Sequence, residues 1–141
     1  MTKEKLIHFL LVEDDPDHAH LITRIMKKNR VKNTIQWLQD GQAALDYLHR
    51  RPPYEDRKQP DVILLDLQLP LVDGIEVLEN IKQSEELRKI PVVMLTTSNV
   101  ERDRLRAYSN HVNSYVVKPL DFDIFKSLIN DMGFYWGLWN Q

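Results

Sequence analysis

Acidic residues follow directly on two apolar runs of the sequence. The run 62–65 consists of four large aliphatic residues and is followed by Asp66, and an earlier run from 7 to 12 is followed by Glu13-Asp14-Asp15. Uninterrupted aliphatic runs are typical of parallel strands that are buried on both faces. Because open α/β sheets bind their ligands at the carboxyl ends of the strands, these acidic residues predict a shared carboxylate pocket.

Two later apolar runs also end in polar residues that suit phosphoryl chemistry. Thr96 closes the run 91–96, and Lys118 follows the run 114–117. Three carboxylates within a few ångströms repel one another unless a cation is present, and Mg²⁺ or another hard divalent ion such as Mn²⁺ prefers oxygen ligands. A hydroxyl and an ammonium group suit the oxygens of a transferred phosphoryl group. Asp66 is then a candidate carboxylate nucleophile.

The elements that must position these residues alternate between strand and helix along the chain. This alternation predicts a single α/β domain with a doubly wound parallel sheet of five strands. A polar segment with three prolines, Arg51 to Pro60, is expected to be an exposed loop, and Asp40-Gly41 a turn. We expect strands near 6–12, 34–38, 61–65, 91–96 and 114–117, and helices starting near 16, 42, 74, 100 and 121.

Composition narrows the possible classes of protein. The chain has 141 residues, a formal net charge of −2 and no cysteine, so disulfides and thiolate metal sites are excluded. The mixed charges argue against a nucleic-acid-binding surface. No segment reads as a signal peptide or approaches the ~20 apolar residues of a membrane span. We therefore expect a cytoplasmic protein with no membrane or nucleic-acid partner.

Together these residues resemble the receiver domain of two-component response regulators. Thr96 lies thirty residues and Lys118 fifty-two residues after Asp66, which is the usual family spacing, and Lys118-Pro119 matches the family's Lys-Pro pair. The resemblance spans about 7–129 and implies the flavodoxin-like (βα)5 fold. The single domain 1–141 would have its core at about 6–131, followed by an aromatic extension of the fifth helix at 132–141.

The resemblance implies a metal site and a phosphoacceptor. Asp66 would accept the phosphoryl group and also bind Mg²⁺. Asp14 would bind the metal directly, Glu13 through water, and Gln68 through its backbone carbonyl. Lys118 would bind the phosphoryl group together with Thr96. Asp15, which follows the acid pair, is expected to face the mouth of the site or to cap the first helix rather than to bind the metal.

The resemblance also implies a conformational switch. Thr96 would move to the phosphoryl group and Tyr115 would turn inward, which changes the face built from helix four, strand five and helix five. Gln68 and Ser98 occupy positions that tune dephosphorylation in the family. The peptide bond before Pro119 is expected to be cis.

Partners follow from a second, looser similarity. The segment 111–115, the loop before strand three and the aromatic tail are similar to the small stand-alone receivers of phytochromes. The phosphodonor would then be a sensor histidine kinase, and the similarity implies one of the phytochrome type. We expect a homodimer through the face built from helix four, strand five and helix five. The candidate contact residues are Tyr115, Phe134, Trp136 and Trp139.

Several alternatives are weaker. A haloacid-dehalogenase-type phosphatase needs a second acid at the position of Gln68. A pseudo-receiver usually lacks one of the acids, the threonine or the lysine, and a flavodoxin-like cofactor binder needs a glycine-rich phosphate loop. Thr97 is an alternative hydroxyl donor to Thr96. The five histidines show no ligand spacing, so a histidine metal site is not expected.

Overall fold

The computed structural model describes residues 6–28, 32–98, 100–118, 123 and 127, and the predicted five-stranded parallel sheet is confirmed. The strand order is β2-β1-β3-β4-β5, so the chain crosses over after β2. The elements are β1 (Ile7–Val12), α1 (Pro16–Lys27), β2 (Asn33–Leu38), α2 (Gly41–Leu48), β3 (Val62–Leu65), α3 (Gly74–Gln83), β4 (Val92–Thr96), α4 (Glu101–Ser109) and β5 (Ser114–Val117).

The end of the chain is described only in part. Asp123 and Ser127 are helical, as expected for the fifth helix. The rest of that predicted helix lies outside the described residues. So do Pro119, with its predicted cis peptide bond, and the aromatic residues Phe134, Trp136 and Trp139.

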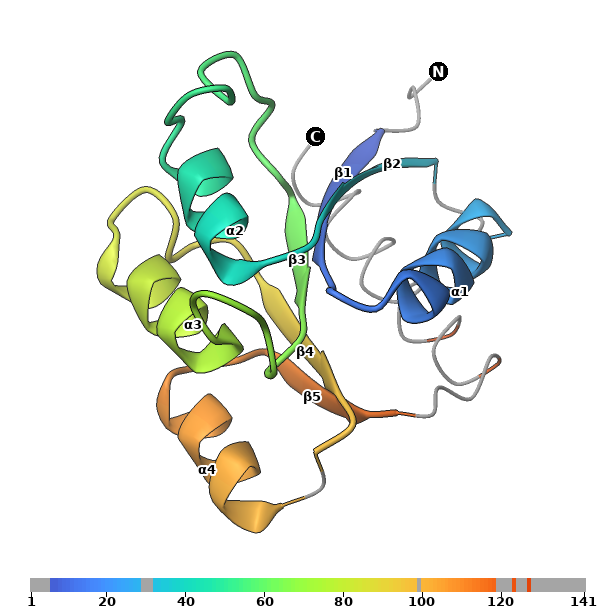
Figure 1. Cartoon of the computed structure of the whole chain (residues 1–141), viewed down its shortest axis with the longest axis vertical. Coiled ribbons are helices and arrows are strands. Elements are labelled where there is room, and N and C mark those ends of the chain that lie inside the picture. The colour runs from blue at the N-terminus through green and yellow to red at the C-terminus, as the bar shows by residue number, and fades with distance from the viewer. Residues whose placement is uncertain (1–5, 29–31, 99, 119–122, 124–126, 128–141) are drawn as a thin grey trace, which may run out of the picture.

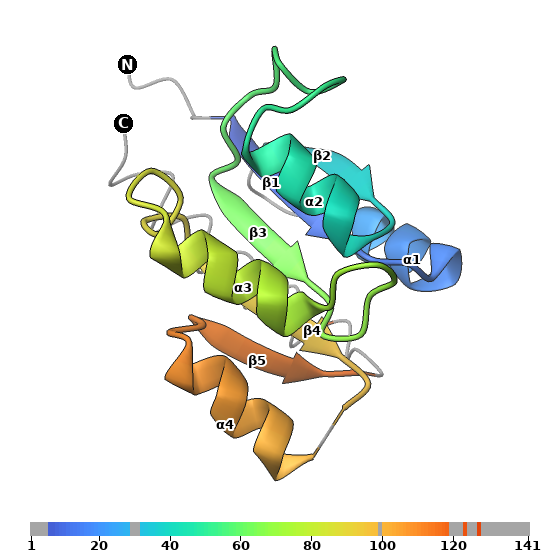
Figure 2. The ribbon, with the colours of Figure 1, turned by 60° about the vertical axis from the view of Figure 1, so that its left-hand side comes forward.

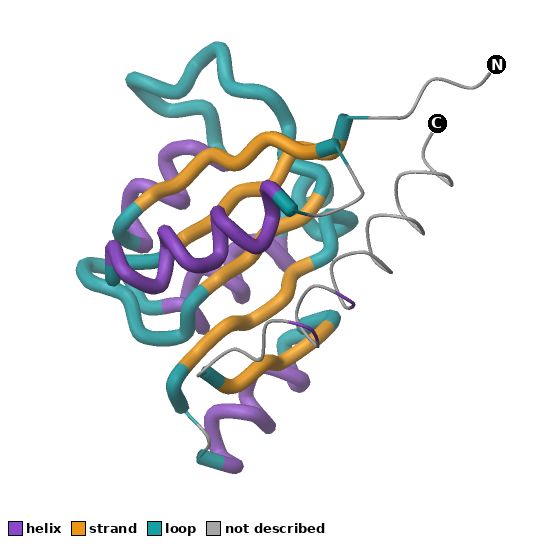
Figure 3. Tube along the Cα trace, turned by 90° about the vertical axis from the view of Figure 1, so that its right-hand side faces the viewer, coloured by secondary structure: helices purple, strands orange, loops and turns teal. Residues whose placement is uncertain are grey.

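Helices cover both faces of the sheet (Figures 1 and 3). Alternate residues of the strands point to opposite faces, so Phe9 packs with α1 while Leu10 packs with α2 and α3. All residues of β3 and β4 are buried, as the uninterrupted aliphatic runs predict. These strands are therefore held on both sides, which fixes where their carboxyl ends lie.

Three helices begin at an aspartate that follows a strand or its loop. The side chains of Asp15, Asp40 and Asp73 accept hydrogen bonds from backbone N–H groups of α1, α2 and α3, respectively. Such caps are each worth about 1 kcal/mol. The expected turn at Asp40-Gly41 is thus the start of α2, whereas the expected capping role of Asp15 is confirmed.

The loop between α2 and β3 is not simply exposed, and the prediction for Arg51–Pro60 is wrong in part. Arg57 is buried and donates to the last carbonyls of α2, with Nε 2.8 Å from Tyr47 O and Nη2 2.7 Å from Leu48 O. These are carbonyls that a helix end leaves without an intrahelical partner. Arg57 therefore fastens the loop to the helix.

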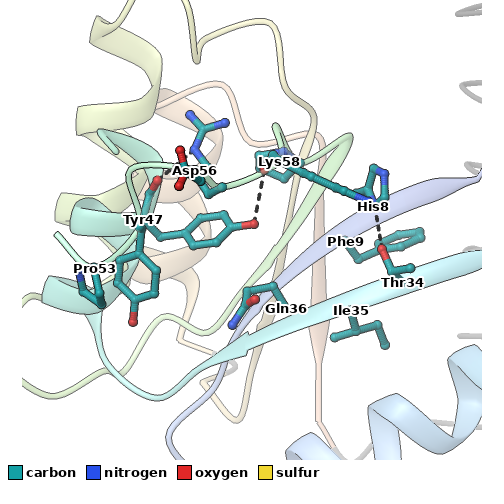
Figure 4. A pocket seen from close by; sticks show the side chains of 12 residues that line it. His8, Phe9, Thr34, Ile35, Gln36, Tyr47, Pro53, Asp56 and Lys58 are labelled. Atoms are coloured by element: carbon teal, nitrogen blue, oxygen red, sulfur yellow. Dashed lines mark hydrogen bonds between the residues drawn. The ribbon is translucent and has the colours of Figure 1, made fainter. Parts of the chain in front are cut away.

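A cavity of about 460 Å³ lies between this loop and the first residues of β1 and β2 (Figure 4). The Tyr47 hydroxyl at its wall donates to the backbone carbonyl of Lys58, at 3.2 Å. His8 and Thr34 line it at the amino ends of their strands. The cavity thus lies at the amino ends of the strands, whereas the predicted carboxylate pocket lies at their carboxyl ends.

Helix α4 is the least buried of the helices α1–α4, as its charged sequence predicts. Ala107 is its buried residue, whereas Leu105 and Tyr108 are exposed. Its neighbour in the sheet layer is β5, at the edge of the sheet (Figure 2). None of the helices in the described part of the chain is long and apolar enough to cross a membrane.

Candidate functional site

Backbone hydrogen bonds continue for one residue beyond the ends of three strands. They fix the backbone positions of Glu13, Asp66 and Lys118. The residue after each of β1, β3 and β5 donates its N–H to the neighbouring strand, which fixes its backbone at the carboxyl edge of the sheet. These bonds run from Glu13 to Leu38 O at 3.0 Å, from Asp66 to Val12 O at 3.0 Å, and from Lys118 to Thr96 O at 2.7 Å.

The predicted carboxylate pocket is confirmed. Glu13, Asp14 and Asp66 each offer an oxygen, and these oxygens all lie within 4.8 Å of one another. Glu13 and Asp66 are buried, whereas Asp14 is exposed at the rim. Because three acids this close repel one another, the pocket favours a bound cation.

Lys118 supplies one positive charge to this pocket. Its ammonium group is buried, donates to Glu13 Oε1, and lies 3.3 Å from Asp66 Oδ2. Burial raises the pKa of Glu13 to about 7, because the charged form loses hydration; the hydrogen bond from Lys118 acts against this rise, and the nearby Asp66 adds to it. Lys118 carries one positive charge, so it balances only one of the three acids when all of them are ionised.

The other carboxylate oxygens are held by backbone groups. Asp15 N–H lies 3.3 Å from Glu13 Oε2, and Gln68 N–H lies 3.2 Å from Asp66 Oδ1. Asp14 and Gln68 both line a cavity of about 450 Å³ beside the carboxylates. This cavity is therefore bordered by Asp14, the exposed acid of the cluster.

The loop that follows Asp66 packs tightly because two glycines lie against its backbone. A Cβ on Gly74 would lie 2.0 Å from the carbonyl oxygen of Asp66, and a Cβ on Gly41 would lie 1.8 Å from the carbonyl oxygen of Val72. Gly74 N–H also donates to Leu67 O at 2.7 Å, and Gly41 N–H to Pro70 O at 3.2 Å. These contacts hold the loop, which runs from the end of β3 to the start of α3 (Figure 2).

Residues 70–72 form a strained turn in the middle of this loop. Val72 N–H donates to Pro70 O at 2.8 Å, which is the hydrogen bond of a γ-turn, and Leu71 between them has a φ of 70°. Leucine rarely adopts this conformation, and this one is 81% exposed. The strain is therefore not offset by burial of the leucine side chain.

Ser98 connects two of the predicted switch residues. Its N–H donates to Thr96 Oγ1 at 3.1 Å, and its carbonyl accepts from the Tyr115 hydroxyl at 3.0 Å. Its own hydroxyl donates to Asp103 in the first turn of α4, at 2.6 Å. Thr96 is buried and Thr97 is exposed. A displacement of Thr96 therefore has a direct route to Tyr115 and α4.

Two residues at the site were not found from the sequence. His18 in the first turn of α1 lies with Nδ1 2.9 Å from Lys118 Nζ, and Trp37 of β2 donates its indole N–H to Glu13 O at 2.7 Å. His18 gains no role from the spacing of the five histidines, because none of them shows the spacing of metal ligands. Its place four residues after Asp14, in the helix that begins directly after the acids, is the signal that could have identified it.

Comparison with known proteins identifies the class. The family model of the response regulator receiver domain matches residues 9–130, and the chain belongs to this family. It is a receiver domain of two-component signalling, and receiver domains are phosphoacceptor modules that bind divalent metal ions.

Among particular proteins, the chain is 53% identical to the probable methanogenesis regulatory protein FilR2 of Methanothrix harundinacea, over 94% of this chain and 84% of that protein. It is 43% identical to response regulator Rcp1 of Synechocystis, over 83% and 80%. The phosphorylated cyanobacterial phytochrome response regulator RcpA superimposes with a TM-score of 0.84 at 35% identity, over 94% of each chain. The Mn²⁺-bound form of Rcp1 superimposes with a TM-score of 0.82 at 37% identity, over 93% and 94%.

Proposed function

We propose that Asp66 accepts a phosphoryl group from a sensor histidine kinase in the presence of Mg²⁺. The observation that carries this proposal is the contact of one buried ammonium group, Lys118, with both Glu13 and Asp66, with Asp14 beside them. This arrangement offers a nucleophile, a cation site and a fixed positive charge at one edge of the sheet.

The donor set fits a hard divalent cation. Asp14 and Asp66 would bind it directly, Glu13 through water, and the Gln68 backbone carbonyl would complete the protein ligands. Oxygen ligands of this kind suit Mg²⁺, and the Mn²⁺-bound form of Rcp1 supports the binding of a divalent ion. When bound, the ion would neutralise charge on the incoming phosphoryl group.

In the proposed reaction, an oxygen of the Asp66 carboxylate attacks phosphorus. A phosphorus–oxygen bond forms to Asp66, and the phosphorus–nitrogen bond of the donor histidine breaks, with its electron pair returning to the imidazole. Lys118 balances charge on the phosphoryl oxygens, and the Thr96 hydroxyl donates to one of them. The protein mainly orients the reactants and neutralises charge.

Signal output would begin at Thr96. When its hydroxyl turns to the phosphoryl group, Oγ1 no longer accepts from Ser98 N–H at its present position. Ser98 also holds Tyr115 and Asp103, so the change reaches β5 and α4 through two hydrogen bonds. Gln68 and Ser98, beside the phosphoryl position, would set how fast water removes the group.

A phosphoryl-transfer assay can distinguish between types of kinase partner. RcpA is named as a phytochrome response regulator, which supports a phytochrome-type kinase, whereas the name of FilR2 concerns methanogenesis. Transfer from the purified cores of a phytochrome kinase and of a kinase without a light receptor would be compared over short times. Faster transfer from the second kinase would contradict the phytochrome assignment.

Two exposed apolar side chains of α4, Leu105 and Tyr108, support a homodimer through this helix. Leu105 is 59% exposed, Tyr108 is exposed beside Tyr115, and apolar side chains on one face favour a protein contact. Phe134, Trp136 and Trp139 are further candidates for this contact. Sedimentation of the full chain and of Leu105→Glu tests the proposal, and an equal mass for both proteins would count against this face.

Acetyl phosphate tests the central proposal without a kinase. The wild-type chain with Mg²⁺ should gain one phosphoryl group, detected by intact-protein mass spectrometry, and Asp66→Asn should gain none. Beryllofluoride should likewise bind the wild type alone. Equal phosphorylation of Asp66→Asn would overturn the assignment of the phosphoacceptor.

A further inference from the structure

The ammonium group of Lys118 has three hydrogen-bond acceptors, and one of them is not a carboxylate. Besides Glu13 and Asp66, it lies 2.9 Å from Nδ1 of His18. A lysine carries three N–H donors, and a buried one must satisfy all of them. His18 Nδ1 is therefore positioned to accept from the third donor in the tautomer that leaves Nδ1 unprotonated.

We propose that His18 is a positioning residue for the phosphoryl-binding lysine. To accept from an ammonium group, Nδ1 must be unprotonated, so the imidazole carries its proton on Nε2. That nitrogen lies 3.6 Å from Asp15 Oδ2, which is beyond hydrogen-bond distance, so the contact with Lys118 is what carries the proposal. The ring would hold Lys118.

The reason for a neutral acceptor is competition within the site. This inference rests on the proposed function, in which the carboxylates of Glu13 and Asp66 also serve the cation and the phosphoryl group. Those two acceptors change partners during the reaction, whereas His18 does not have to. By keeping one N–H of Lys118, His18 would leave the other two directed at the reacting oxygens.

Without this positioning role, His18 would be an ordinary surface residue of α1. His18 has a side-chain exposure of 37% and stands in the first turn of a helix, where it could simply face solvent. In that case His18→Leu and His18→Asn would behave alike. In the proposed role they differ, because the carbonyl oxygen of asparagine can accept a hydrogen bond near the position of Nδ1 and leucine cannot.

The experiment compares the wild type, His18→Leu and His18→Asn as full chains. We expect the phosphorylation rate with acetyl phosphate at saturating Mg²⁺ to fall about tenfold in His18→Leu, the loss expected for one charge-assisted hydrogen bond. His18→Asn should recover most of the rate. The Mg²⁺ affinity from calorimetry should stay close to wild type in both variants. The thermal unfolding midpoint should fall in His18→Leu, which leaves a buried N–H of Lys118 without an acceptor, and stay close to wild type in His18→Asn.

A second readout does not depend on phosphorylation. The side-chain NMR signal of the Lys118 ammonium, in protein without Mg²⁺, should show slow hydrogen exchange in the wild type and in His18→Asn, and fast exchange in His18→Leu. The proposal would be overturned if His18→Leu kept the wild-type phosphorylation rate and the slow hydrogen exchange of Lys118. Equal losses of phosphorylation rate in the two variants, or a parallel loss of Mg²⁺ affinity, would also overturn it. Absence of phosphorylation in the wild type would instead refute the proposed function, while the exchange measurement would still test the positioning role.

Discussion

Replacement of Gly74 by alanine should disturb the phosphoacceptor through the backbone. The added Cβ would lie 2.0 Å from Asp66 O and 2.7 Å from Leu67 Cα, and these atoms cannot move aside by a side-chain rotation. Relief of the clash requires a shift of roughly 1 Å or more, since carbon atoms pack at about 3.5–4.0 Å. Overpacking of this kind costs about 1–3 kcal/mol.

The same shift should slow the chemistry of Asp66. A misplacement of ~1 Å can reduce a rate about 100-fold, so we expect Gly74→Ala to be phosphorylated by acetyl phosphate about two orders of magnitude more slowly. Urea unfolding measures the loss of stability, and mass spectrometry over time measures the rate at saturating Mg²⁺.

Gly41→Ala is a matched control for this prediction. It introduces the same methyl group against the far end of the same loop, 1.8 Å from Val72 O. It should cost a similar amount of stability but slow phosphorylation less, because Val72 is farther along the chain from Asp66. If Gly74→Ala left both the unfolding midpoint and the rate unchanged, the tight packing of this loop against Asp66 would be refuted.

Three further predictions concern stability and pH. Leu71→Asn should stabilise the fold by about 1 kcal/mol in urea unfolding, because asparagine tolerates positive φ better than leucine; a clear loss would contradict the strain. Ser98→Ala should cost about 1–2 kcal/mol through its bond to Asp103, and a double-mutant cycle with Asp103→Ala that gave no coupling would refute this. Because the pKa of Glu13 is raised from 4.5 to about 7, its contribution to the stability of the metal-free protein is present below pH ~4.5 and lost as pH rises through ~7. Mg²⁺ needs the ionised form, so its affinity should increase with pH up to about 7, and this part of the increase should be absent in Glu13→Gln.

The fold and the carboxylate cluster could be predicted because their signals are local. Four consecutive aliphatics in β3 favour a strand that is covered on both faces, and the parallel order then brings Asp66 and Glu13 to the same end of the sheet. Lys118 could be placed for the same reason. Residue spacing in the sequence thus translates directly into position in the sheet.

Features that depend on packing between distant segments could not be predicted. Arg57 is buried because the carbonyls at the end of α2 accept from it, and its loop has no periodic pattern that would indicate this. The contact of His18 with Lys118 joins residues one hundred positions apart. The γ-turn at Leu71 is set by hydrogen bonds and close contacts from α2 and α3 rather than by the preference of leucine.

The indole of Trp37 gives the site a built-in optical probe. Its N–H is bonded to the carbonyl of Glu13, and its ring meets His20 edge-on at 5.9 Å between centroids. Indole emission responds to the charges around it, so events at the carboxylates should alter the fluorescence of this one side chain. In a protein whose other tryptophans, Trp136 and Trp139, are replaced by phenylalanine, binding and phosphoryl turnover could be followed in real time without an attached dye.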